Sequence, residues 1–236
     1  MSYARWYDLL HVGPASPTMV AWFASLVPDG GRVLEVGAGT GRVSGALAAR
    51  AASLTCLEPS AEMRAILRDN LAGLPVTVLP DAMPGFVAPQ AFEYAVLATV
   101  LAEIPHTDRR AVFAAIADSL TPGGMVATDM VDDEPVPDRP ERKVRSAVRG
   151  GVEYTRWTAI RPVGRDVAAV RHVYRRYVGG ALVERSAVEL RHWFHRPKDV
   201  LADLAAVGLE PVGGSALTGG DDRGTLVARK PGDRSR

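Results

Sequence analysis

The sequence is poor in cysteine and has no long apolar run. Its single cysteine, Cys56, lies in the apolar stretch SLTCLEP, which excludes an internal disulfide and a cysteine-rich zinc site. A lone thiol suits a reducing compartment, and we expect no metal site. No apolar stretch reaches the roughly 18 residues of a membrane span. The N-terminal segment carries Asp8 and lacks the apolar core of a secretion signal, so we expect a cytoplasmic protein.

The chain also has almost no net charge. Its formal charge is +1, with 47% hydrophobic and 23% charged residues, as in an ordinary globular protein. This balance gives no overall attraction to nucleic acid or to membranes. Positive charge is nevertheless concentrated at 132–196, which carries 14 Lys or Arg against 9 Asp or Glu.

Two common glycine motifs are absent from the stretch RVLEVGAGTGR at 32–42. An apolar run ending at Val36 predicts a buried strand, and the alternating glycines after it allow a ligand to approach the backbone closely. The dinucleotide fingerprint G-x-G-x-x-G is not met, because Arg42 stands where the last glycine should be. No Gly-Lys-Ser/Thr follows, so the phosphate loop is excluded too. The turn predicts a polar ligand without a pyrophosphate.

Strand-like and helix-like segments alternate through the first half of the chain. We expect strands at 33–36, 54–57, 76–79, 94–99 and 125–130, and two closing strands at 209–212 and 225–228. We expect helices at 2–10, 17–27, 42–50, from 60, 107–120 and 197–208, and a turn at 121–124. This alternation predicts a parallel sheet covered on both faces, with ligands bound beyond the carboxyl ends of its strands. Gly37, Glu58, Asp81 and Thr99 all lie at or just past these ends.

The pattern changes after residue 131. The charged, proline-bearing stretch 132–151 has no clear period and predicts a loop or a mobile lid. Strand-like runs follow at 152–160, 167–178 and 182–194, and Gly179-Gly180 predicts a hairpin between the last two. We therefore expect a cofactor-binding core at 1–131 and 197–230. An inserted antiparallel substrate cap is expected at 132–196, and a disordered tail at 231–236.

Four motifs in order, RVLEVGAGTGR, LEPSAEM, LPDAMP and LTPGG, resemble those of class I S-adenosylmethionine-dependent methyltransferases. The resemblance covers about 1–130 and 197–230. It implies an α/β fold: a Rossmann-like, seven-stranded, mostly parallel sheet with helices on both faces, here with a small antiparallel sheet inserted after strand five. It also implies S-adenosylmethionine as the cofactor and S-adenosylhomocysteine as the product.

The resemblance assigns cofactor-binding roles residue by residue. Glu35 would orient the glycine turn and the ammonium of the ligand, Glu58 would accept both ribose hydroxyls, and Asp81 would accept from the adenine amino group. The other residues expected at the cofactor are Tyr7 (or Tyr3), Gly37, Ala38, Gly39, Pro59, Met63, Ala82, Met83, Ala98 and Thr99. Met63 and Tyr7 fit the packing face of a helix equally well.

Methyl transfer from a sulfonium is a direct displacement that depends on alignment, and a base helps only when the nucleophile must lose a proton. The family therefore has no fixed catalytic triad. Where the family often has a histidine after strand four, this chain has Glu103, and His106 follows three residues later. The candidate catalytic or substrate-contacting residues are His106, His172, Tyr174 and His192, with Glu103 and His195 as further candidates; His172, Tyr174 and His192 fit sheet packing as well.

We expect methyl transfer to an oxygen or nitrogen of a small molecule, in natural-product metabolism. The expected partners are a small-molecule substrate, anionic if the basic insert binds it, and a second copy of the chain in a homodimer, with neither nucleic acid nor membrane. A nucleic-acid N-methyltransferase is disfavoured because LATVLAEIP lacks an Asn-Pro-Pro-Tyr signature. The alternatives are a methyltransferase of a peptide C-terminal carboxylate, bound by Arg142, Arg145 or Arg149, an NAD(P)-dependent oxidoreductase and a non-catalytic cofactor-binding subunit.

Overall fold

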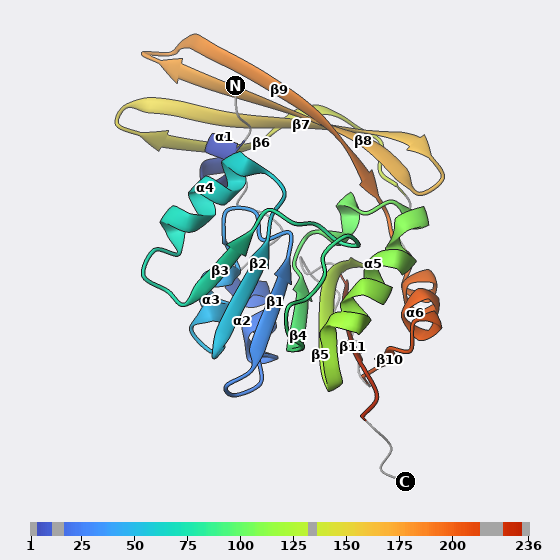
Figure 1. Ribbon diagram of the computed structural model, residues 1–236. Coiled ribbons are helices and arrows are strands. Elements are labelled where there is room, and N and C mark those ends of the chain that lie inside the picture. The colour runs from blue at the N-terminus through green and yellow to red at the C-terminus, as the bar shows by residue number, and fades with distance from the viewer. Residues whose placement is uncertain (1–3, 11–16, 132–135, 213–223, 233–236) are drawn as a thin grey trace. The chain divides into compact units, whose positions relative to one another are not determined.

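The computed structural model describes residues 4–10, 17–131, 136–212 and 224–232 (Figure 1). The chain forms two compact units: residues 1–13 with 134–194, called here the antiparallel unit, and residues 14–133 with 195–236, called the core unit. Three expectations concern residues outside those that the structure describes. They are the expectation about Tyr3, residues 132–135 of the loop and the end of the tail at 233–236.

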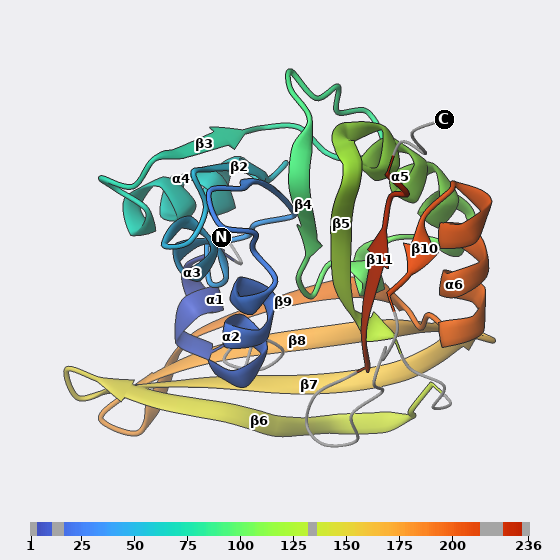
Figure 2. The ribbon, with the colours of Figure 1, turned by 90° about the horizontal axis from the view of Figure 1, so that it is seen from below.

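The core unit is built on a seven-stranded sheet with the order β10-β11-β5-β4-β1-β2-β3 (Figure 2). Its strands are β1 (Arg32–Val36), β2 (Ser53–Leu57), β3 (Val76–Leu79), β4 (Phe92–Leu97), β5 (Leu120–Val131), β10 (Glu210–Pro211) and β11 (Gly224–Arg229). Strands β1 to β5 pair in parallel, whereas β11 is antiparallel to both β5 and β10. The predicted seven-stranded, mostly parallel sheet is confirmed.

Helices cover both faces of this sheet, because alternate side chains of each strand point to opposite sides. On β1, Val33 packs in a cluster with α2 (Pro17–Ser25), α3 (Ser44–Ala48) and α4 (Ala61–Asn70). Its neighbour Leu34 packs in a second cluster with α5 (His106–Ser119) and α6 (Pro197–Ala206). No helix in the described part of the chain is long and apolar enough to cross a membrane.

Local signals set the ends of two core helices. The Ser60 hydroxyl accepts a hydrogen bond of 3.3 Å from the Met63 amide and so caps α4. Helix α6 runs from Pro197 to Ala206. Gly208, two residues beyond, has φ of +77°, and its amide donates to the Ala205 carbonyl at 3.0 Å, which forms a glycine cap. Both boundaries agree with the sequence prediction.

The predicted turn at 121–124 lies within β5 instead of before it. Leu120 already pairs with Phe92 of β4, and the register shifts before Met125 pairs with Tyr94. Gly123, with φ of +82°, lies in this irregularity. The Thr-Pro-Gly-Gly sequence therefore forms a bulge in a longer strand, because pairing resumes on both sides of it.

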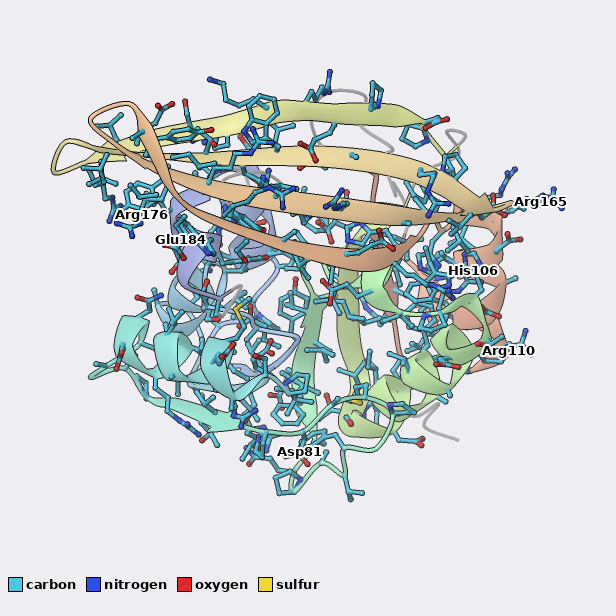
Figure 3. All side chains as sticks on the ribbon, turned by 90° about the horizontal axis from the view of Figure 1, so that it is seen from above. Asp81, His106, Arg110, Arg165, Arg176 and Glu184 are labelled. Atoms are coloured by element: carbon cyan, nitrogen blue, oxygen red, sulfur yellow. The ribbon has the colours of Figure 1, made fainter. Side chains whose placement is uncertain are left out.

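The antiparallel unit is a four-stranded sheet with the order β6-β7-β8-β9. It consists of β6 (Arg139–Arg149), β7 (Val152–Gly164), β8 (Val167–Val178) and β9 (Ala181–Trp193). The β8–β9 hairpin turns at Gly179 and Gly180, with φ of +56° and +82°, as predicted for a two-residue turn. Near this turn Arg176 donates to Glu184 at 3.0 Å (Figure 3).

Helix α1 (Ala4–Leu10) groups with the antiparallel unit, although the sequence assigned it to the core. Its Trp6 stacks on Tyr174 of β8 with ring centroids 5.8 Å apart and meets Tyr154 of β7 edge-on at 5.7 Å. Aromatic contacts of this kind add to the area that each ring buries. They explain why the first helix follows the inserted sheet.

The prediction of a loop or lid at 132–151 is wrong for 139–149, which form β6. This strand lies at the edge of its sheet, and every side chain except Ala147 is exposed. An exposed edge strand shows no alternation of apolar and polar residues, so its period is invisible in the sequence. It also tolerates a proline, here Pro140, which cannot donate to a ladder.

Replacing Gly41 should destabilise the core unit more than a glycine in open space. Gly41 has φ of +90°, and a Cβ there would lie 2.7 Å from Cδ1 of the buried Leu67. Gly41→Ala should cost about 2–4 kcal/mol, because a left-handed backbone and overpacking both add. The matched control is Gly123→Ala, with φ of +82° and nothing within 4 Å, which should cost about 1–2 kcal/mol. Urea unfolding measures both; equal losses would contradict the packing argument.

Candidate functional site

Four loops converge at the carboxyl ends of neighbouring parallel strands. Gly37 follows β1, Glu58 follows β2, Asp81 follows β3, and Thr99 follows β4. The chain order reverses between β1 and β4, which is where open α/β sheets bind ligands. The structure therefore brings most of the predicted cofactor residues to one edge of the core sheet: Glu35, Gly37, Ala38, Gly39, Glu58, Pro59, Met63, Asp81, Ala82, Met83, Ala98 and Thr99. Tyr7 lies on α1 of the antiparallel unit.

The Glu58 carboxylate is held against the glycine turn. Its Oε2 accepts a 2.9 Å hydrogen bond from the amide of Gly39, and its Oε1 accepts one of 2.8 Å from the amide of Ser60. Arg64, which the sequence analysis missed, donates to the backbone oxygens of Glu58 and Pro59 at 2.8 and 2.7 Å. Each carboxylate oxygen can accept more than one hydrogen bond, so Glu58 keeps acceptor capacity for a ligand hydroxyl.

The two glycines of the turn have different surroundings. A Cβ at Gly37, where φ is +70°, would lie 2.6 Å from Cγ2 of Val100, so that side is filled by protein. A Cβ at Gly39, where φ is +58°, would meet nothing within 4 Å. The space at the Cβ position of Gly39 is therefore open, next to a glycine whose amide binds the largely buried Glu58 carboxylate. This open cradle beside a carboxylate fits a ligand that carries hydroxyl groups.

Glu35 is a buried carboxyl group on β1, two residues before Gly37. Its side chain is 2% exposed, and Cys56 Sγ donates to its Oε2 at 3.4 Å. Burial raises the pKa of Glu35 to about 7, with a smaller rise from the charge of Glu58, against the lowering effect of the neighbouring Ser44 and Cys56 side chains. A cation bound nearby would favour the carboxylate form. This property fits the predicted role of Glu35 beside the ammonium of the cofactor.

The predicted adenine contacts lie nearer the surface. Asp81 and Ala82 are exposed on the loop after β3, where Figure 3 labels Asp81. Met83 is half-buried and packs against the cluster of α5 and α6, whereas Met63 is 8% exposed on α4. Asp81 is therefore the accessible polar side chain among the predicted adenine contacts, and Met63 and Met83 contribute apolar surface.

Thr99 adopts a backbone conformation that is rare for a β-branched residue. Its φ is +61°, which costs on the order of 1–3 kcal/mol unless the surroundings enforce it. Its amide donates to Oδ1 of Asp129 at 2.6 Å, and Asp129 is fully buried near the end of β5. The sequence analysis missed Asp129. An acidic residue near the carboxyl end of an apolar strand, in MVATDM, was the signal that could have found it.

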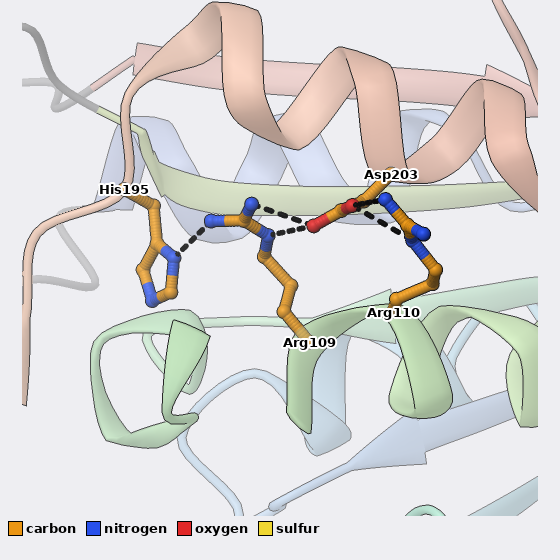
Figure 4. Close-up of polar contacts among 4 residues, drawn as sticks. All are labelled: Arg109, Arg110, His195 and Asp203. Atoms are coloured by element: carbon orange, nitrogen blue, oxygen red, sulfur yellow. Dashed lines mark hydrogen bonds and ion pairs between the residues drawn. The ribbon is translucent and has the colours of Figure 1, made fainter. Parts of the chain in front are cut away.

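His195 belongs to a buried ionic cluster between α5 and α6 (Figure 4). Arg109 Nη1 donates to His195 Nδ1 at 2.8 Å, and Arg109 Nε donates to Asp203 Oδ2 at 2.8 Å. Arg110 donates to the other oxygen of Asp203 at 2.9 and 3.0 Å. Burial, then the charges of Arg109 and His106, lower the pKa of His195 to about 4. The ring is therefore neutral at pH 7, with the acceptor at Nδ1 assigned from the arginine donor.

His106 and Glu103 are the candidates near the end of β4. His106 begins α5 and meets the ring of His195 edge-on, with centroids 4.9 Å apart. Glu103 lies on the short helix η1 (Leu101–Glu103) that follows β4. Desolvation, and to a smaller degree the charge of Glu58, raise the pKa of Glu103, although its side chain is accessible to solvent. Its raised pKa makes this carboxyl group a better proton acceptor than an ordinary glutamate.

The other predicted catalytic residues lie in the antiparallel unit. His172 and Tyr174 share one face of β8, with ring centroids 6.3 Å apart, and Tyr174 is 1% exposed in its stack on Trp6. His172 Nδ1 lies 2.9 Å from the Thr158 hydroxyl. Burial, then the charges of Arg156 and His192, lower the pKa of His172 to about 3. Roles in catalysis for His172, Tyr174 and His192, which lies on β9, stay predictions.

Comparison with known proteins gives a domain match. Residues 33–124 match the family model described as a methyltransferase domain, a range that runs from β1 to the bulge in β5. No curated protein sequence matches the chain significantly. The match includes the glycine turn, Glu58, Asp81 and Thr99, so it covers the edge of the sheet at which the candidate site lies.

Solved structures match nearly the whole chain. Streptomyces venezuelae DesVI is 22% identical with a TM-score of 0.82, and the alignment covers 97% of this chain and 98% of that one. KedS8 from Streptoalloteichus sp ATCC 53650, a sugar N-methyltransferase, is 21% identical with a TM-score of 0.80 and coverage of 98% and 93%. CalS10 from Micromonospora echinaspora, an amino pentose methyltransferase solved with S-adenosylmethionine bound, is 22% identical with a TM-score of 0.74 and coverage of 96% and 93%.

The chain thus contains a methyltransferase domain within the fold of the class I S-adenosylmethionine-dependent methyltransferases. The predictions of this class, of its fold and of an S-adenosylmethionine-dependent methyltransferase enzyme are confirmed. Within the class, the fold is similar to those of a sugar N-methyltransferase and an amino pentose methyltransferase.

His195 should make the core unit sensitive to mild acid. Its pKa of about 4 in the folded protein lies below the ordinary value of 6.5, so the unfolded chain binds more protons between these values. Stability should therefore fall as the pH drops from about 6.5 to 4. His195→Gln removes this proton uptake and should reduce that fall by about 2–3 kcal/mol, measured by urea unfolding at several pH values. If the stability of His195→Gln has the same pH dependence as that of the wild type, the lowered pKa assigned to His195 is contradicted.

Proposed function

We propose that this protein transfers the methyl group of S-adenosylmethionine to an amino nitrogen of a small natural-product intermediate, such as an amino sugar. The observation that carries the proposal is the Glu58 carboxylate, fixed by the Gly39 and Ser60 amides beside the open space at Gly39. A carboxylate in this position suits the two vicinal hydroxyls of a ribose, because it offers two acceptor oxygens in one plane.

The remaining cofactor contacts follow from the same edge of the sheet. Glu35, whose pKa of about 7 responds to nearby charge, would stabilise the cofactor ammonium from below the turn. Asp81 would accept from the adenine amino group, and Met63 and Met83 would contribute apolar surface. Backbone at Ala98 and Thr99 would line the methionine end. These roles join residues of four strand ends into one elongated site.

When bound, S-adenosylmethionine supplies an electrophilic methyl group on a positively charged sulfur. The protein must align a nucleophile with it and exclude water. An ammonium group must lose its proton before it can act as a nucleophile, and Glu103, with its raised pKa, is the carboxylate suited to accept that proton. His106, at the start of α5 three residues beyond η1, is the alternative acceptor.

The choice of nitrogen is supported by the similar solved structures and by this chemistry. KedS8 is named a sugar N-methyltransferase and CalS10 an amino pentose methyltransferase. A carboxylate nucleophile would need no base and would not explain a proton acceptor with a raised pKa near the end of β4. A hydroxyl acceptor on the same class of small molecule is the alternative within this proposal.

The antiparallel unit and the setting of the enzyme complete the proposal. We assign the antiparallel unit as the substrate cap, because the core unit already supplies the full set of motif residues for the cofactor. Cys56 is a free, buried thiol, which suits the reducing cytoplasm that we propose as the location.

The proposed reaction is tested by incubating the protein with S-adenosylmethionine and paired sugars that carry an amino or a hydroxyl group at the same carbon. Mass spectrometry should detect one added methyl group on the amino sugars and none on the hydroxyl partners. Methylation of the hydroxyl sugars alone would overturn the choice of nitrogen. Calorimetric binding of NAD without binding of S-adenosylhomocysteine would overturn the cofactor as well.

Glu58 should contribute strongly to cofactor affinity. Glu58→Ala removes the acceptor of both ribose hydroxyls and should weaken S-adenosylhomocysteine about 10- to 100-fold, because hydrogen bonds to a charged group contribute about 1.5–3 kcal/mol. The matched control is Asp69→Ala, which removes an exposed carboxylate at the end of α4 and should leave the affinity unchanged. Isothermal calorimetry measures both. An unchanged affinity in Glu58→Ala would refute the ribose assignment.

Gly39 should be needed for ligand binding more than for packing. In Gly39→Ala the new methyl group enters space that no protein atom fills within 4 Å, and it would occupy part of the cradle. The cost in stability should stay at the roughly 1–2 kcal/mol of a left-handed alanine. The affinity for S-adenosylhomocysteine should fall at least about tenfold, by steric exclusion. A variant that unfolds more easily but binds normally would show that the cradle lies elsewhere.

A further inference from the structure

We propose that Asp129 is a positioning residue for the cofactor site, acting through the strained backbone of Thr99 on the glycine turn at Gly37. The inference rests on the proposed function in that the glycine turn is taken to bind S-adenosylmethionine. It adds a residue that lies outside the four motifs of the class and outside the matched range 33–124.

The first link joins the ends of two strands. Asp129 is fully buried, and its Oδ1 accepts a 2.6 Å hydrogen bond from the amide of Thr99, which lies 30 residues earlier in the chain. A short hydrogen bond to a carboxylate is stronger than one to a neutral acceptor. The neighbouring Thr128 hydroxyl also bridges the strands, by donating to the Leu97 carbonyl at 3.3 Å, and it donates to the Asp129 backbone carbonyl at 3.2 Å as well.

The second link is the conformation of Thr99. With φ of +61° it is the one non-glycine residue with a positive φ in the part of the chain that the structure describes. A branched Cβ disfavours this region, so an outside contact must hold it there. The Asp129 carboxylate is such a contact, because it binds the amide that the φ rotation orients. This kink in the backbone at Thr99 lies just past the end of β4 and leads the chain into Val100 and η1.

The third link is steric. Val100 follows the kink and lies so close to Gly37 that a Cβ on the glycine would be 2.6 Å from Val100 Cγ2. The position of Val100 therefore limits where the backbone of Gly37 can lie. The Gly37 and Ala38 amides complete the arrangement by donating to the Leu57 carbonyl at 2.8 and 3.0 Å.

The same kink also sets the start of η1. The Val100 carbonyl accepts from the amide of Glu103 at 2.8 Å, so the residue next to Thr99 is hydrogen-bonded to the proposed proton acceptor. The contacts thus run from Asp129 through Thr99 to Val100, and from there to both the glycine turn and Glu103. A buried carboxylate that touches no ligand would in this way position both halves of the site.

The test separates positioning from general stability by relieving the strain independently. Asp129→Ala should weaken S-adenosylhomocysteine about tenfold or more, measured by calorimetry. Thr99→Gly adopts a positive φ without help, and its affinity is the reference for the double variant because Thr99 itself lies at the cofactor site. The double variant should bind within about threefold of Thr99→Gly, because the site no longer needs the carboxylate.

The controls keep the outcome decisive. Thr128→Val removes the other hydrogen bond between the strand ends and should leave the affinity unchanged. Asp129→Asn keeps an acceptor oxygen and should bind within about threefold of wild type, which covers the case that the alanine variant fails to fold. The inference is overturned if Asp129→Ala binds normally, if the asparagine variant loses as much affinity as the alanine variant, or if Thr99→Gly fails to rescue binding. If wild-type protein does not bind S-adenosylhomocysteine, the proposed function itself fails.

Discussion

The site depends on the carboxylate of Glu58 and the backbone amides that hold it. Glu58 follows β2, and its Oε2 accepts from Gly39, which follows β1, so one side chain joins the loops of two adjacent parallel strands. Because parallel strands end at one edge, this contact brings a charged acceptor to the open side of the glycine turn. The proposed ribose, ammonium and adenine contacts all lie at this edge of the sheet.

The surroundings of two buried titratable groups in the core unit set their protonation states. Burial raises the pKa of Glu35 to about 7, so its charge depends on what binds beside it. Burial and Arg109 lower the pKa of His195 to about 4, so its ring stays neutral and accepts a hydrogen bond. The first group lies under the site and can respond to a cationic ligand. The second holds α5 to the segment that leads into α6.

Local sequence patterns predicted much of the core and less of the insertion. The apolar runs, the Ser60 cap and the Gly208 end signal depend on residues close in sequence, and the structure agrees with them. Strand β6 was missed because an exposed edge strand has no buried face and so no alternation. The turn at 121–124 was misplaced because only pairing with β4 shows that it is a bulge within β5.

The sequence by itself pointed to the class of protein, through the resemblance of four ordered motifs to those of a known family, and its spacing placed the glycine turn and the acidic residues after strands two and three. The tertiary structure decided which of these groups meet and in what state. That Glu58 binds Gly39, that Thr99 is held by Asp129 and that α1 packs on the inserted sheet are contacts across 19 or more residues of chain. Such contacts leave no local pattern, since their energy comes from burial and hydrogen bonds that form only once the strands and helices have packed.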